Sequence, residues 1–204
     1  MSIKAVVFDL DDTLFSEVDY VKSGFKAVAE YVEGRFGLKN VFAELVELFE
    51  RDRSGVFDRF VAAHGLDGAV AGSFTELYRE HFPNIVLSDE VKQTLAKLRA
   101  DGFKLGIVTD GRPTGQRNKI AALGLDALVD RIIVTDELGG AEFRKPNPKA
   151  FELMCDEFGI DAEQMLYVGD NPQKDFAVKK YLPIKTARVS THGGLYENGE
   201  YKFN

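Results

Sequence analysis

The chain has 204 residues, 45% of them hydrophobic and 29% charged, which are the proportions of an ordinary globular protein. Its formal net charge of -7 argues against a nucleic-acid partner, because phosphate backbones are bound by basic surfaces. The single cysteine excludes an intrachain disulfide, and no run approaches the roughly 18 apolar residues that span a membrane. We therefore expect a cytoplasmic protein without a membrane partner.

The first pattern along the chain predicts a buried strand. Ala5–Phe8 is a short run of apolar, β-branched and aromatic residues, as in strands that are covered on both faces. The run ends abruptly at Asp9, and the acids Asp11 and Asp12 follow. Asp12 is expected to cap the turn rather than to react, because Asp side chains readily bond to nearby backbone groups.

The next segment, residues 16–85, is predicted to be entirely helical. Apolar residues recur at spacings of three and four in four successive stretches, and no strand pattern interrupts them. The fourth helix is expected to start at a capping-box pattern of Ser73 and Glu76. Five phenylalanines in this segment are interpreted as the core of a helical bundle and not as a substrate pocket: Phe25, Phe42, Phe49, Phe57 and Phe60.

The rest of the chain alternates between helices and strands. The predicted strands are 104–109, 131–135, 165–168 and 184–189, and the predicted helices are 88–102, 116–123, 147–158 and 175–181. Such alternation predicts an α/β fold with a doubly wound, Rossmann-like parallel sheet flanked by helices. The domain organisation expected is a core domain of residues 1–15 and 86–204, interrupted by the helical domain of residues 16–85.

Polar side chains gather at one predicted edge of this sheet. Ligands of open α/β sheets bind beyond the carboxyl ends of the strands. Eight candidate site residues follow strands at that edge: Asp9, Asp11, Thr109, Asp110, Gly111, Lys145, Asp170 and Asp175.

Four of the five acids among these residues predict a metal site: Asp9, Asp11, Asp170 and Asp175. Two carboxylates about 4 Å apart repel by roughly 4 kcal/mol at an effective dielectric constant near 20, so several of them need a compensating cation. Oxygen ligands without a neighbouring His or Cys favour a hard ion, and Mg²⁺ is the usual one beside phosphate. Lys145 adds a positive charge, while Thr109 and the backbone amides of Asp110 and Gly111 offer donors to phosphate oxygens.

A metal site, a lysine and amide donors together are suited to phosphoryl transfer. The sequence offers neither a suitable cysteine nor a serine with a histidine base, so a carboxylate is the expected phosphoryl acceptor. Asp9 lies at the strand end, where its side chain is held rigidly. Asp11, two residues later, could protonate the leaving oxygen and then activate the water that cleaves the intermediate.

The order of these residues resembles that of the haloacid dehalogenase-like hydrolase superfamily. Asp9-Leu10-Asp11-Asp12-Thr13-Leu14 is similar to its first motif and Val108-Thr109-Asp110-Gly111 to its second. Lys145-Pro146 is similar to the third motif, and the segment from Gly169 to Asp175 to the fourth. The resemblance extends from Lys4 to about Val189, and the helical insertion lies where the family carries its C1-type cap.

The resemblance implies a role for each motif residue. Asp9 would be nucleophile and metal ligand, and Asp11 would be the acid/base and a metal ligand through its backbone carbonyl. Thr109 would hold the phosphoryl group and Lys145 would neutralise it. Asp170 would bind Mg²⁺, and Asp175 would order the metal or its waters.

The expected activity is Mg²⁺-dependent hydrolysis of a small phosphomonoester, such as a sugar phosphate or a nucleotide monophosphate. Asp11 argues against dehalogenation, because a halide leaving group needs no proton. A phosphomutase of the same fold remains an alternative, as does a non-enzymatic phosphate acceptor like a response-regulator receiver. The partner expected is the small-molecule phosphate ester alone, bound by a monomer or a homodimer.

Overall fold

The computed structural model describes residues 2–171 and 173–190 and divides the chain into two compact units. Pro172, in the fourth motif, and the tail from Thr191 lie outside the described residues. One unit combines the residues up to Val18 with those from Val86 onward, and the other is Asp19–Ile85. The first motif and the three later ones therefore belong to the same unit.

That unit is built on a five-stranded sheet in which every pair of neighbouring strands is parallel. The strands are β1 (Ala5–Phe8), β2 (Lys104–Thr109), β3 (Arg131–Val134), β4 (Met165–Gly169) and β5 (Lys185–Arg188), in the order β3-β2-β1-β4-β5. All four residues of β1 are buried, as the apolar run predicts for the central strand. The predicted α/β fold with a Rossmann-like parallel sheet is confirmed.

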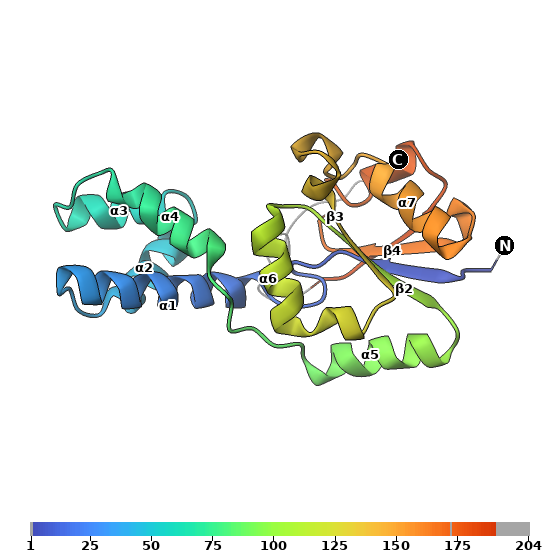
Figure 1. The fold of residues 1–204 in the computed structure, drawn as a ribbon, viewed down its shortest axis with the longest axis horizontal. Helices are drawn as coiled ribbons and strands as arrows, with labels where there is room; N and C mark the ends of the chain where they lie inside the picture. The colour runs from blue at the N-terminus through green and yellow to red at the C-terminus, as the bar shows by residue number, and fades with distance from the viewer. Residues whose placement is uncertain (1, 172, 191–204) are drawn as a thin grey trace. The chain divides into compact units, whose positions relative to one another are not determined.

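Helices cover both faces of this sheet (Figure 1). Helices α5 (Asp89–Ala100) and α6 (Pro113–Leu123) lie on one side and α7 (Lys149–Phe158) on the other. Short 3-10 turns connect the elements: η1 (Leu125–Ala127), η2 (Thr135–Leu138), η3 (Ala141–Phe143), η4 (Ala162–Gln164) and η5 (Ala177–Lys180). On the α7 side, Phe151 and Met154 pack with Val7, Val108 and Tyr167 of the sheet. This core fixes the strand ends from which the candidate site residues project.

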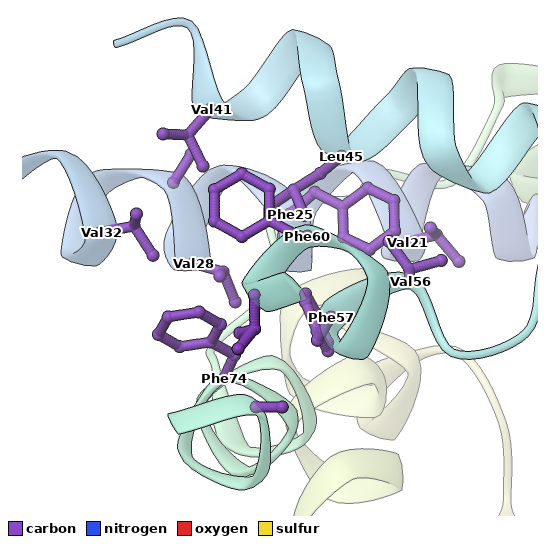
Figure 2. Packing of buried hydrophobic residues seen from close by; sticks show 13 residues of the cluster. Val21, Phe25, Val28, Val32, Val41, Leu45, Val56, Phe57, Phe60 and Phe74 are labelled. Carbon is purple, nitrogen blue, oxygen red and sulfur yellow. The ribbon is translucent and has the colours of Figure 1, made fainter. Parts of the chain in front are cut away.

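The second unit consists of helices α1 (Glu17–Phe36), α2 (Val41–Arg51), α3 (Val56–Ala63) and α4 (Val70–Glu80), the first of which begins in the preceding unit. Figure 2 shows phenylalanine side chains from α1, α3 and α4 pointing into a shared core. Phe25, Phe57 and Phe60 are buried there and Phe49 packs against them, as predicted. Phe42 is 39% exposed, so the prediction of a core position for this residue is wrong.

Three predicted helix boundaries differ from the structure. Ser73 lies inside α4, and the chain turns three residues before that helix, where the carboxylate of Asp67 accepts a bond from the Ala69 amide at 2.9 Å. Helix α6 already begins at Pro113, because proline fits the first turn of a helix. The predicted helix 175–181 is only the 3-10 turn η5.

Candidate active site

The strand register brings the first, second and fourth motifs to the same sheet edge. Phe8 pairs with Ile107 of β2 and Val168 of β4, so the residues that follow β1, β2 and β4 end up side by side. The Asp9 amide continues the ladder by donating to the Val168 carbonyl at 2.8 Å. The position of Asp9 is therefore fixed by backbone bonds as well as by its side chain.

The side chain of Asp9 forms a buried ion pair with Lys145. The Lys145 ammonium donates to Asp9 Oδ1 at 2.7 Å and lies 2.9 Å from Asp175 Oδ1, and all three side chains are at most 2% exposed. The same ammonium also donates to the Tyr167 hydroxyl at 2.8 Å. One lysine thus links the ends of β1 and β4 to the third motif.

This ion pair determines the protonation states of Asp9 and Lys145. Burial raises the pKa of Asp9, but Lys145 and Lys174 outweigh it, so the pKa lies below its usual value. Burial lowers the pKa of Lys145, but Asp9 leads the groups that hold the pKa well above its usual value. Asp9 is therefore an ionised carboxylate, as both a nucleophile and a metal ligand must be.

The acids at this edge fit a divalent cation. Carboxylate oxygens of Asp9, Asp170 and Asp175 all lie within 4.8 Å of one another. Asp9 Oδ2 is buried and has no hydrogen-bond partner among the described residues, which leaves it available to a metal ion or another electrophile. A donor set made only of carboxylate oxygens suits a hard cation.

Asp175 is tightly held within this cluster. Its Oδ1 faces Lys145, while its Oδ2 accepts a bond from the Asn171 amide at 2.9 Å. A Cβ at Gly169 would lie 2.5 Å from Asp175 Oδ2, so the glycine makes room for the carboxylate. Because both oxygens already have protein donors, Asp175 is better suited to orienting the metal site than to binding the ion directly.

The pKa of Asp170 predicts a pH dependence of metal binding. Burial, with Asp9 and Asp175, raises this pKa from 3.8 to about 7. Since a metal ion must displace the proton, we expect Mg²⁺ affinity to fall about tenfold per pH unit below that value. Calorimetric Mg²⁺ titrations across this pH range test the expectation, and an affinity that does not change with pH would contradict it.

The same raised pKa has a consequence for stability. Between pH 3.8 and about 7 the folded metal-free protein retains a proton on Asp170 that the unfolded chain has lost. The free energy of unfolding that depends on this proton is highest at low pH, and it falls as the pH rises through about 7 and the folded protein loses the proton. Asp170→Asn is therefore expected to raise the melting temperature of the metal-free protein at pH 8, while removing its stabilisation by Mg²⁺.

The second motif lies beside this cluster at the end of β2. The Thr109 hydroxyl is fully buried and accepts a bond from Gln116 Nε2 at 2.6 Å. The Asp110 carboxylate accepts from the Thr135 hydroxyl at 2.9 Å and from the Lys145 amide at 3.0 Å, so it ties the third motif to β2. Gly111 has a φ of 138°, which favours glycine.

Asp11 is turned toward α6 and is held there by two residues that the sequence analysis did not single out. Lys119 Nζ donates to Asp11 Oδ1 at 2.7 Å and Gln116 Nε2 to Oδ2 at 2.9 Å. Gln116 and Lys119 are three residues apart and therefore share one face of the helix. The sequence carries no signal for them, because polar residues in a helix usually lie at the surface, whereas both of these are buried.

The loop after Asp11 carries another titratable group. Asp12 Oδ1 accepts a bond from the Glu17 amide at 2.8 Å at the start of α1, which agrees with the capping role expected for Asp12. Burial, followed by the nearby Asp11, raises the pKa of Glu17 to about 7.

Arg144, beside the third motif, forms an ion pair with Asp136. Its Nε donates to Asp136 Oδ1 at 2.7 Å and its Nη2 donates to Oδ2 at 2.6 Å.

A family model described as haloacid dehalogenase-like hydrolase matches residues 3–177. The chain belongs to this family. Its relatives include a glyceraldehyde 3-phosphate phosphatase of Methanopyrus kandleri, 30% identical over 97% of this chain and 88% of that protein. A pyrophosphatase of Halalkalibacterium halodurans is 31% identical over 93% of this chain and 84% of that protein. A hydrolase structure from Geobacter sulfurreducens shares the fold, with a TM-score of 0.68, 21% identity and 93% coverage of both chains.

These comparisons confirm the predicted enzyme class, a phosphatase of the haloacid dehalogenase-like family. They argue against the alternative that the protein is a non-enzymatic phosphate acceptor like a response-regulator receiver. Among the described residues, no helix combines the length and the apolar character needed to cross a membrane.

Proposed function

We propose that the protein hydrolyses a small phosphomonoester with the help of Mg²⁺ and through an aspartyl-phosphate on Asp9. The observation that supports this most strongly is the state of the Asp9 carboxylate. It is buried and ionised, with Oδ1 held by Lys145 and Oδ2 without a hydrogen-bond partner in the described part of the chain. Asp9, Asp170 and the Asp11 carbonyl would hold the ion, which when bound offsets the charge of the acids and of the phosphoryl group.

In this proposal the first step is attack by the Asp9 carboxylate on the phosphorus atom. An O–P bond forms while the ester O–P bond breaks. Asp11, protonated and turned away from Lys119 in the substrate complex, gives its proton to the leaving alcohol. Asp11, then ionised, removes a proton from water. The water oxygen forms a bond to phosphorus while the Asp9 O–P bond breaks, which releases phosphate and restores the Asp9 carboxylate and the protonated Asp11. Thr109, the backbone amides of Asp110 and Gly111, and the charge of Lys145 would stabilise the transferred group.

The proposed substrate class is a short phosphorylated sugar or sugar-like aldehyde, with nucleotide monophosphates as the second class to examine. A relative named for glyceraldehyde 3-phosphate matches nearly the whole chain, which supports a small, flexible substrate. The acidic net charge of -7 supports neither a nucleic-acid nor a membrane substrate. A cytoplasmic location and a monomeric or homodimeric state remain predictions.

We propose that the helical domain, residues 16–85, acts as a cap on the core domain formed by residues 1–15 and 86–204. It is inserted between the first and second motifs and has a phenylalanine core of its own. A cap excludes water from a phosphoryl-transfer site and can recognise the leaving group.

The test is phosphate release from a panel of sugar, triose and nucleotide phosphates, with pyrophosphate included. We expect sustained release with Mg²⁺, loss of activity with EDTA, and recovery when Mg²⁺ is added in excess. Turnover that is indifferent to chelation would contradict the metal role. Conversion of one phosphate ester into its isomer without free phosphate would identify a phosphomutase instead.

A further inference from the structure

We propose that Gln116 is a positioning residue that couples Asp11, the proposed acid/base, to Thr109 of the second motif. The inference rests on the proposed function, which it deepens by giving a role to a helix residue outside the four motifs. Gln116 lies near the start of α6, and its side chain is buried. Its basis is a single amide group that contacts both of these residues.

The side-chain nitrogen of Gln116 forms two hydrogen bonds. Nε2 donates to Thr109 Oγ1 at 2.6 Å and to Asp11 Oδ2 at 2.9 Å. A side-chain amide nitrogen carries two N–H donors, so these two bonds use both of them. An ionised carboxylate only accepts, which fixes the end of the amide that faces Asp11. One planar group therefore sets the position of the acid/base relative to the end of β2.

The bond to Thr109 limits where its hydroxyl hydrogen can point. Oγ1 accepts from Gln116, so the hydrogen of the hydroxyl group must point to another acceptor. Thr109 is completely buried, and no acceptor for this hydrogen is found in the part of the chain that the structure describes. A buried donor without an acceptor is unfavourable, so the hydroxyl group is oriented in advance toward an incoming oxygen atom.

The bond to Asp11 leaves one carboxyl oxygen for proton transfer. Gln116 donates to Oδ2, whereas Lys119 donates to Oδ1 at 2.7 Å. A protonated carboxyl group still accepts on its other oxygen. Gln116 can therefore hold Oδ2 while Oδ1 leaves Lys119 and carries the proton, so that Asp11 stays in position through both steps of the reaction.

The packing around Gln116 keeps its amide in this place. A Cβ at Gly111 would lie 3.2 Å from Gln116 Cγ, so the glycine lets the side chain run close to the second motif. The backbone amide of Gln116 donates to the Arg112 carbonyl at 3.1 Å in the first turn of α6. A side chain packed this closely has few alternative rotamers, so both bonds form before substrate binds.

The experiment is a double-mutant cycle of Gln116→Leu and Thr109→Val, with kcat/KM measured on an aryl phosphate and on a sugar phosphate in excess Mg²⁺. Gln116→Leu removes both donors and keeps a similar volume. We expect kcat/KM to fall at least about tenfold, and further on the sugar phosphate, whose leaving alcohol needs the proton of Asp11. With Thr109→Val already present, the same change should cost less than about twofold on the aryl phosphate, because no hydroxyl group is left to orient.

Two further variants separate positioning from stability. Gln93→Leu changes an exposed glutamine of α5 and should stay within about twofold of the wild type. Gln116→Glu keeps the shape of the side chain and provides the test if Gln116→Leu does not fold. Its carboxylate cannot donate and repels Asp11, so kcat/KM should fall at least as far as in Gln116→Leu. Melting temperatures are recorded for every variant.

Three results would overturn the inference. The first is wild-type kcat/KM in a folded Gln116 variant. The second is the same loss from Gln116→Leu with and without the Thr109 hydroxyl group, which would indicate structural support alone. The third is an equal loss on both substrates, which would remove the link to Asp11. A wild type that releases phosphate from no ester would refute the proposed function and this inference with it, whereas an active wild type with additive losses would refute only the inference.

Discussion

Asp9→Asn is expected to lower kcat by at least about a thousandfold on every substrate that the enzyme accepts. The amide of asparagine is a poor nucleophile. The substitution also removes the anionic oxygen that the metal and Lys145 require. The change keeps the shape of the side chain, so the loss should come from chemistry rather than from packing. Initial rates of phosphate release with Mg²⁺ in excess provide the measurement.

The control for Asp9→Asn must account for the buried lysine. Removing one partner of a buried ion pair often costs about 3–5 kcal/mol of stability, but Lys145 keeps Asp175 at 2.9 Å. Melting temperatures should therefore be recorded beside the rates, with Asp126→Asn as a matched change of an exposed acid. A folded Asp9→Asn protein that retains more than about one hundredth of the wild-type rate would exclude Asp9 as the nucleophile.

Asp11→Asn is expected to slow hydrolysis by about 10²–10⁴-fold, the usual contribution of a general acid/base. The size of the loss should depend on the leaving group. An alkyl alcohol needs a proton to leave, so sugar phosphates should be affected more than aryl phosphates, whose phenolate leaves readily. With the aryl substrate, the second step should then limit the rate, and a phosphorylated enzyme should accumulate.

Lys119→Met is the matched comparison for Asp11→Asn. It removes the same 2.7 Å ion pair while leaving the Asp11 carboxyl group in place, so it isolates the structural part of the effect. An equal loss on alkyl and aryl phosphates in Asp11→Asn would contradict the assignment of the proton donor. The assignment would also be contradicted if Lys119→Met lost as much activity as Asp11→Asn on each substrate.

The sequence predicts the sheet better than the helices that surround it. The β1 run is apolar throughout because both faces of the strand are covered, and short runs of this kind are typical of the central strands of parallel sheets. Helix starts are less certain, since a capping pattern such as Ser73 and Glu76 can also occur inside a helix. Phe42 shows the same limit, because helical spacing puts a residue near the apolar face without fixing how deeply it is buried.

Some residues of the candidate site could be predicted from the sequence and others could not. Acids that directly follow apolar strands could be found from the sequence, because strand ends in a parallel sheet meet at one edge. Tyr167 and Lys119 could not, since an aromatic residue in a strand indicates a core position and a lysine in a helix indicates a surface position. Their roles depend on the three-dimensional contacts with Lys145 and Asp11.

The most direct measurement is to locate the phosphoryl group itself. Asp11→Asn protein would be mixed with Mg²⁺ and an aryl phosphate, quenched in acid, digested and examined by mass spectrometry. The mechanism predicts one phosphoryl group per chain, carried by the peptide that contains Asp9, and absent when Asp9 is also replaced by Asn. Phosphate on another residue, or an Asp9-dependent reaction that never labels the protein, would contradict covalent catalysis by this carboxylate.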